Sequence, residues 1–414
     1  MVVNIPPLKE YDTIPLDPYD LGRIKSFLKK NHLETAFKIT PYSLQTTSWV
    51  GVVRCGQVQI QVLPKMIASD ACDRDTIFKN LIFMLSYTRN LNIKSSEYSM
   101  LSKCENPFLE ILIREFANSL FECLRKHSPK SYIRQEDNLC FLKGKLKISE
   151  HIRYNVANQA HFYCEYDEFS EDNVLNQLFY YVTTQLLNIS KDNENKKLLG
   201  LIKNFYSEIS WMPFDKAKAN KVKLYRNQLS FEKPLKLAKM FIEKSSVDMS
   251  VNKIKNIALL WDMNKLFEEF VFEILRRNLK GDWKVTAQKG KKLLRQQDDS
   301  KKRRNTYTDI YACKGNTKIV LDTKYKKFEG INNVSNSDIF QVSTYCLLYD
   351  SKKAILIYPQ WGEKLDVPSC NLNTPDGVEP YEIQFKTINL MRDIKKNKEQ
   401  IISEVCQILE PPLN

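Results

Sequence analysis

The sequence predicts a mixed α/β (α+β) protein of more than one domain, and three features support this. Its 414 residues, 43% of them hydrophobic, are enough to bury two or three cores. Stretches with the two-residue alternation of strands occur beside stretches with the period of helices. Towards the C-terminus strands and helices follow one another, as in a sheet flanked by helices.

Residues 1–72 are predicted to form a small β-rich domain. In this part Val58, Ile60 and Val62 alternate with glutamines, and Gly56 follows a valine-rich run. Alternation on both sides of a glycine predicts a hairpin. Pro64 would end its second strand.

Residues 73–250 are predicted to be a helix-rich middle domain that docks a partner. The apolar spacing changes there to the helical period, and Asn106-Pro107 suits a helix start. Strand-like sequence is expected at 141–155, and the polar, lysine-rich stretch 230–256 leads into the next domain. The predicted helices cover residues 74–91, 107–127, 170–190 and 191–209.

Residues 251–414 are predicted to hold a central mixed sheet flanked by helices. The order begins with a helix at 257–279, a strand at 283–288, a flexible basic loop and two strands. It continues with a helix at 337–349, strands at 353–359 and 381–390, and a final helix.

Composition excludes several classes of function. Ten cysteines without a CxxC pair predict reduced thiols and no structural zinc site. The sequence has neither an apolar run of eighteen residues nor a signal-peptide pattern, so we expect a cytoplasmic protein without a membrane partner. It contains no GxxxxGK[ST] or GxGxxG loop, so any nucleotide energy would come from another chain.

The charge predicts a polyanionic partner. The chain has 63 Lys and Arg against 49 Asp and Glu, a formal net charge of +14. Such an excess favours nucleic acid or an anionic membrane surface, and charge alone does not distinguish the two.

One apolar strand ends in an acid and a base, in the segment IVLDTKYK. Gly315-Asn316 before it predicts a two-residue hairpin turn. Counting back along both strands places Asp309 opposite Asp322, and Lys324 on the same face. A surface salt bridge of Lys324 is the alternative reading.

Two carboxylates this close repel unless a cation lies between them, and Mg²⁺ suits one or two carboxylates plus waters. Lys324 would orient the attacking water and stabilise charge on a phosphate. Asp309, Asp322 and Lys324 therefore predict phosphodiester hydrolysis.

Other residues extend this candidate site. Glu268, Glu269 and Glu273 lie off the centre of the apolar face of a helix, and one of them could add a metal ligand. Gln341 and Tyr345 share a helical face and could touch a phosphate or Lys324. The basic loop would contact nucleic-acid backbone phosphates without reading sequence, through Lys291, Lys292, Arg295, Lys301, Arg303 and Arg304. A solvated loop is the alternative.

These residues resemble a known signature. Asp309 followed by Asp322-Thr-Lys324 looks like that of the PD-(D/E)xK nucleases, with Thr308 in place of the proline, and Gln341-x-x-x-Tyr345 is similar to a motif of their RecB-like branch. The stretches WVGVVRCGQVQIQVLPK, EDNVLNQLF, WDMNKLFEEFVFEIL and LDTKYK resemble, in this order, the McrC family of nuclease subunits of McrBC-type (type IV-like) restriction systems.

The resemblance implies a C-terminal PD-(D/E)xK domain that cuts DNA with Mg²⁺, with Asp309 and Asp322 as ligands. Glu268 best matches the family's third acid, with Glu273 as the alternative. It implies docking of the other regions on a hexameric AAA+ GTPase, McrB, which recognises modified DNA and whose GTP hydrolysis the chain would stimulate. Double-strand cleavage would need transient pairing of two nuclease subunits or two successive nicks.

The leading hypothesis is thus a Mg²⁺-dependent DNA endonuclease subunit. Two rivals are a non-catalytic nucleic-acid-binding assembly subunit and an RNA-directed nuclease of the same fold. The sequence itself does not separate DNA from RNA.

Overall fold

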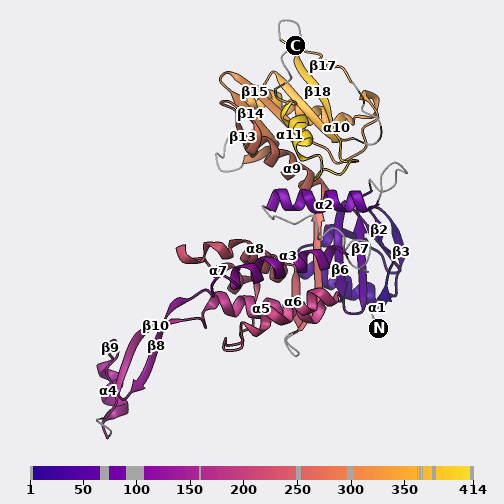
Figure 1. Ribbon diagram of the computed structural model, residues 1–414. Helices are drawn as coiled ribbons and strands as arrows, with labels where there is room; N and C mark the ends of the chain where they lie inside the picture. The colour runs from indigo at the N-terminus through magenta and orange to yellow at the C-terminus, as the bar shows by residue number, and fades with distance from the viewer. Residues whose placement is uncertain are drawn as a thin grey trace. The chain divides into compact units, whose positions relative to one another are not determined.

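The computed structural model describes residues 3–65, 74–89, 107–157, 160–248, 253–295, 303–360, 362, 365, 367–374 and 379–410 (Figure 1). This part of the chain contains eleven α-helices and several sheets, so the predicted mixed α/β class is confirmed. None of the described helices is long and apolar enough to cross a membrane.

The chain forms two compact units. The terminal unit comprises Met1–Ser102 and Leu260–Asn414, and the middle unit comprises Lys103–Leu259. The domain boundaries expected at 72/73 and 250/251 rest on composition and stay predictions.

The N-terminal part of the terminal unit is rich in β-structure. The predicted hairpin is confirmed: β6 pairs with β7 up to Cys55↔Val58, and Gly56 has the φ of +60° that the turn needs. Gln59 and Gln61 are also buried, so β7 is covered on both faces and not half-exposed as its alternation suggested. The elements are β1 (Val3–Asn4), β2 (Leu8–Lys9), β3 (Thr13–Pro15), α1 (Pro18–Lys30), η1 (Glu34–Ala36), β4 (Phe37–Ile39), β5 (Ser43–Thr46), β6 (Trp49–Cys55), β7 (Val58–Leu63) and α2 (Arg74–Arg89).

The middle unit has a helical core, as predicted. The four helices expected from periodicity are present: α2 in the terminal unit, and α3, α5 and α6 here. Helix α8 occupies the polar stretch where a loose boundary was expected, because that stretch conceals a buried apolar face. The elements are α3 (Pro107–Leu124), α5 (Val174–Ile189), α6 (Asn193–Asn204), α7 (Lys216–Lys221), η4 (Arg226–Phe231), α8 (Glu232–Glu243), β11 (Ser245–Asp248) and β12 (Lys253–Asp262), which runs on into the terminal unit.

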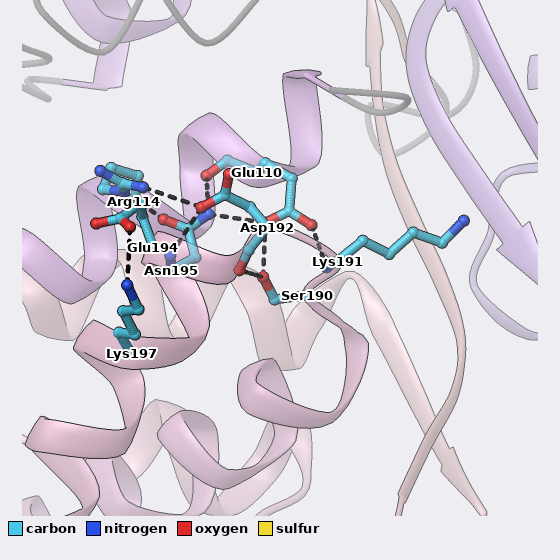
Figure 2. Close-up of polar contacts among 8 residues, drawn as sticks. All are labelled: Glu110, Arg114, Ser190, Lys191, Asp192, Glu194, Asn195 and Lys197. Carbon is cyan, nitrogen blue, oxygen red and sulfur yellow. Dashed lines mark hydrogen bonds and ion pairs between the residues drawn. The ribbon is translucent and has the colours of Figure 1, made fainter. Parts of the chain in front are cut away.

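A buried carboxylate ties α3 to the start of α6 (Figure 2). Oε1 of Glu110 accepts a hydrogen bond from the backbone N–H of Lys191 at 2.7 Å. Its Oε2 accepts from the Ser190 hydroxyl and the Asn195 amide, both at 2.7 Å. Since both oxygens have donors, burial of Glu110 fixes the packing of these helices.

An antiparallel arm projects from the helices of the middle unit (Figure 1). Strands β8 (Ser131–Leu139) and β10 (Phe162–Ser170) pair along nine residues each, and β9 (Lys145–Leu146) adds to β10. Between them lies helix α4 (Ile148–Asn155). The expectation of strand at 141–155 is therefore largely wrong, because the segment's apolar residues repeat every four positions as well as alternating.

The C-terminal part of the terminal unit is built on a six-stranded mixed sheet in the order β13-β14-β15-β16-β18-β17. The first three strands are antiparallel, and β15, β16 and β18 are parallel. Helix α10 covers one face, where Tyr311, Val320 and Leu356 meet Val342 and Tyr345. The elements are α9 (Met263–Asn278), β13 (Lys284–Arg295), β14 (Arg303–Lys314), β15 (Thr317–Thr323), η5 (Ile331–Asn333), α10 (Asn336–Tyr349), β16 (Lys353–Pro359), β17 (Cys370–Leu372), β18 (Tyr381–Ile388) and α11 (Lys398–Cys406).

Two predictions for this part are wrong. The helix expected at 257–279 begins only at Met263, where Asp262 caps it by accepting from Asn264 N–H at 3.0 Å. The preceding residues belong to β12, whose apolar run fits either structure. The expected basic loop is largely strand, because β13 and β14 pair as far as Arg295↔Arg303.

Candidate active site at a strand end

The β14–β15 hairpin has the predicted register. Gly315 has a φ of +56°, and Lys314 pairs with Thr317 across the turn. The registered pairs continue to Ile310↔Leu321. The next residue of each strand is one of the two predicted acids.

Asp309 and Asp322 follow this last pair. Oδ2 of Asp309 accepts hydrogen bonds from the backbone N–H of Thr323 at 2.9 Å and from its hydroxyl at 3.1 Å. Burial raises the pKa of Asp309, and the Thr323 donors and the charge of Lys324 only partly counter this effect.

Asp322 is a buried acid with an incomplete set of partners. Its residue is 1% exposed, and among the described residues no hydrogen-bond donor serves Oδ1. Oδ2 lies 2.7 Å from Lys324 Nζ in an ion pair. Burial, followed by repulsion from Asp309, raises the pKa of Asp322 to about 7.

The ammonium of Lys324 is held from three sides. It donates to Oε1 of Gln341 at 2.9 Å, pairs with Asp322, and lies 3.7 Å from Oδ1 of Asp338. Burial alone would lower the pKa of Lys324, but Asp322, Asp338 and Asp309 outweigh it and raise the pKa. Lys324 is therefore a fixed cation at neutral pH.

Helix α10 orients this lysine through a chain of hydrogen bonds. Nε2 of Gln341 donates to the Tyr345 hydroxyl at 2.7 Å, as their shared face predicted. That hydroxyl donates to the backbone carbonyl of Tyr307 at 2.7 Å. The chain fixes the amide of Gln341 with its oxygen toward Lys324.

Of the glutamates on α9, Glu268 is the one beside the acids. It is partly buried, and burial followed by repulsion from Asp309 raises its pKa to about 7. The side-chain amide of Gln288 donates a hydrogen bond to its Oε1. A pocket of about 550 Å³ is lined by Glu268, Glu269 and Gln288, among others.

Glu273 is occupied elsewhere. Its Oε2 lies 2.7 Å from both Arg276 and Arg277. Burial would raise its pKa, but the hydrogen bonds and charges of the two arginines lower it. This leaves Glu268 as the better candidate for a third acid at the site.

Asp309 and Asp322 are the carboxylates at this strand end that could hold a metal ion. Within the described parts of the chain, no three His, Cys, Asp or Glu side chains converge as a ready-made metal centre. The pair of Asp309 and Asp322 still fits Mg²⁺, which commonly binds one or two carboxylates and several waters. A cation would satisfy the open Oδ1 of Asp322 and relieve the repulsion that raises its pKa.

The basic residues predicted for DNA contact lie on the β13–β14 ribbon. Lys291 and Lys292 are exposed on β13, and Lys291 Nζ is 5.9 Å from the ring centre of Tyr349. Arg295, Arg303 and Arg304 are strand residues whose side chains are not described, and Lys301 lies outside the described residues.

Three residues of the site were missed by sequence reasoning. Thr323 supplies both donors to Asp309, Asp338 adds a second anion to Lys324, and Gln288 holds Glu268. Thr323 stands inside the acid-x-Lys triplet, and the alternation of strands could not show that its hydroxyl turns to Asp309. No sequence pattern marks Asp338 or Gln288, because only the packing of α10 and β13 brings these residues near Lys324 and Glu268.

Comparison with known proteins identifies the family. The family model described as "McrBC 5-methylcytosine restriction system component" matches residues 44–359, more than half of the chain. The chain belongs to this McrBC family. A search of the curated proteins found no match.

Two solved structures share the fold of this McrBC family member. One is a chain from a half-complex of a tetradecameric assembly of Thermococcus gammatolerans McrB AAA+ hexamers with bound McrC. It is 21% identical with a TM-score of 0.75 and covers 97% of this chain and 99% of that chain. The other, from a cryo-EM structure of the T. gammatolerans McrBC complex, is 24% identical with a TM-score of 0.53 and covers 66% and 88%.

Proposed function

We propose that this chain is the Mg²⁺-dependent DNA endonuclease subunit of a GTP-dependent McrBC-like restriction complex. The observation that carries the proposal is Asp322, a buried acid with an open oxygen beside Asp309 and Lys324. Membership of a restriction-system family supports DNA as the substrate. The arrangement of acids and lysine suits a PD-(D/E)xK nuclease.

In this proposal Asp309 and Asp322 hold the Mg²⁺ ion, with Glu268 as the third acid. When bound, the ion lowers the pKa of a coordinated water and offsets charge on the scissile phosphate. Lys324 orients the attacking water and stabilises charge that develops on the phosphate. Gln341 and Asp338 keep its ammonium in place, so that little reorganisation is needed during the reaction.

DNA would be held mainly through its backbone. Lys291 and Lys292 are exposed on the same ribbon that carries Asp309. Exposed lysines contact phosphates without reading sequence and make binding sensitive to salt. The target sequence or modification would then be read by another subunit.

The proposed partner is a hexameric, McrB-like AAA+ GTPase whose GTP hydrolysis this chain stimulates. Support comes from the two similar structures, one of McrB AAA+ hexamers with bound McrC and one of an McrBC complex. The arm of the middle unit offers a docking surface, since large apolar side chains near its tip are more than half exposed. They are Phe141, Leu142, Ile148, Ile152, Tyr154 and Val156.

Docking by the arm is tested with the double change Ile148→Ser and Ile152→Ser, one turn apart on α4. We expect loss of binding to the motor subunit and of GTPase stimulation, with an unchanged unfolding midpoint. Leu201→Ser, on an exposed position of α6, is the matched control. Unchanged binding by the arm variant would refute this surface.

The rival is a non-catalytic assembly subunit, and one observation favours it: the described residues contain no ready-made three-ligand centre. The decisive assay is plasmid cleavage with Mg²⁺, GTP and the motor subunit added singly and together, using Asp322→Asn. Asp350→Asn is the matched control, because Asp350-Ser-Lys352 is also an acid-x-Lys triplet but is solvated.

We expect wild type and Asp350→Asn to cut and Asp322→Asn to be inactive. Cleavage by purified Asp322→Asn would refute the proposed site. No cleavage by any protein in the full mixture while DNA is still bound would favour the rival. A parallel assay with RNA of the same sequence tests the RNA-directed alternative.

A further inference from the structure

Gln288 has an unusual backbone in the middle of a strand. The registered pairs Ala287↔Ile310 and Lys289↔Thr308 flank it, so the same register sets it opposite Asp309. Its φ is +48°, in the left-handed region that residues other than glycine rarely adopt. Such conformations persist where surrounding contacts impose them, often at functional sites.

In this conformation the side chain of Gln288 contacts helix α9. The side-chain amide of Gln288 donates a hydrogen bond to Oε1 of Glu268. Glu268 is repelled by Asp309, and it borders an open pocket of about 550 Å³. Without a donor on the β13 side, repulsion would favour rotamers of Glu268 that point into the pocket, away from Asp309.

We propose that Gln288 is a positioning residue of the nuclease site, whose amide holds the Glu268 carboxylate toward Asp309 in readiness for a divalent cation. The inference rests on the proposed function. Asn and Gln donors behind a ligating carboxylate fix its orientation, and their loss commonly weakens metal binding 10–100-fold. The left-handed backbone turns Gln288 out of the strand alternation so that its amide reaches α9.

Two variants separate the effect of the Gln288 side-chain amide from the effect of its left-handed backbone. Gln288→Gly keeps the left-handed conformation without strain and removes the donor. Gln288→Met keeps the length of the side chain and removes the donor. Gln384→Ala is the control, because Gln384 also donates to a glutamate, Glu382, at 2.6 Å in the same sheet.

The readouts are Mn²⁺ binding to the full chain by electron paramagnetic resonance, without DNA, and the thermal unfolding midpoint in EDTA. For Gln288→Gly we expect roughly tenfold weaker Mn²⁺ binding with an unfolding midpoint equal to or above that of wild type. Gln288→Met should be weakened to the same extent, and Gln384→Ala should match wild type. A merely structural role would move the midpoint and not the binding.

The possible outcomes distinguish failure of the role proposed for Gln288 from failure of the proposed nuclease function. Wild-type Mn²⁺ affinity in Gln288→Gly and Gln288→Met overturns the role of Gln288 and leaves the proposed nuclease intact. A wild-type protein that binds no Mn²⁺ and cuts no DNA overturns the proposed function, and this inference with it. Equal weakening in Gln384→Ala would show that the effect is not specific to Gln288 and would also overturn it.

Discussion

Two buried carboxylates, Glu110 in the middle unit and Asp322 in the terminal unit, have nearly equal exposure, 2% and 1%, but opposite surroundings. Glu110 receives hydrogen bonds on both oxygens from neutral donors. Asp322 has an open oxygen, a lysine and a second acid nearby. The two acids differ in their donors and not in their burial, so burial alone does not mark a functional acid.

The energetic reason is that burying an ionised group without donors is costly, whereas a fully satisfied network stabilises the fold. In the folded protein the carboxylate of Glu110 therefore needs no further donor or cation. At the Asp322 site the negative charge of the two acids is not fully balanced, and a bound cation could balance it. Changes at the two sites should accordingly have different consequences.

The largest expected effect is on the rate of DNA cleavage. Lys324→Met should reduce DNA cleavage by roughly 10²–10³-fold, since a preorganised charge-stabilising group is lost. Binding of Mg²⁺ should persist or tighten, because a competing cation has been removed beside Asp322. Single-turnover cleavage and calorimetric Mg²⁺ titration check the two results. Loss of both Mg²⁺ binding and cleavage would instead assign Lys324 a structural role.

The next effect is on stability at the satisfied acid. Glu110→Gln should lower the free energy of unfolding by roughly 2–3 kcal/mol, because one acceptor becomes an NH₂ group facing donors. Urea unfolding measures this loss. Binding of Mn²⁺ by the terminal unit should not change. A stable Glu110→Gln protein would remove the contrast on which the comparison depends.

An effect of similar size is the pH dependence of stability without metal. Because the pKa of Asp322 is raised from 3.8 to about 7, the folded state binds the proton more tightly than the unfolded state. Its contribution to stability is therefore present at low pH and is lost as pH rises from about 4 to about 7. Relative to wild type, Asp322→Asn should become more stable by up to roughly 1 kcal/mol per pH unit in this window. Urea unfolding in EDTA checks this, and a constant difference between pH 5 and pH 8 contradicts it.

The smallest effect separates the two glutamates of α9. Glu273→Gln breaks partly exposed ion pairs with Arg276 and Arg277, which should cost no more than about 1 kcal/mol. Cleavage and Mn²⁺ binding should stay at wild-type levels, whereas Glu268→Gln should weaken both. The reverse ranking would make Glu273 the third acid.

Much of the site geometry could be predicted because it depends on local rules. Gly315-Asn316 sets the hairpin register, and that register determines which residues of β14 and β15 stand together. The four-residue spacing of Gln341 and Tyr345 likewise determines their shared face.

The parts that could not be predicted depend on pairing between distant or polar segments. The paired residues of strands β8 and β10 are about 30 positions apart in the sequence. Much of the surface of both strands is exposed, so no apolar core pattern marks them. The basic second half of β13, after the predicted strand at 283–288, resembled a loop for the same reason. The donor from Gln288 depends on one left-handed residue, which sequence patterns do not show.

The most direct test is the thermal unfolding midpoint of wild type and Asp322→Asn in EDTA and in saturating Mg²⁺. We expect Asp322→Asn to be the more stable protein in EDTA, and Mg²⁺ to raise the midpoint of wild type but not of the variant. Equal Mg²⁺ shifts in both proteins, or a shift in neither, would contradict the claim that the open carboxylate is kept for a cation.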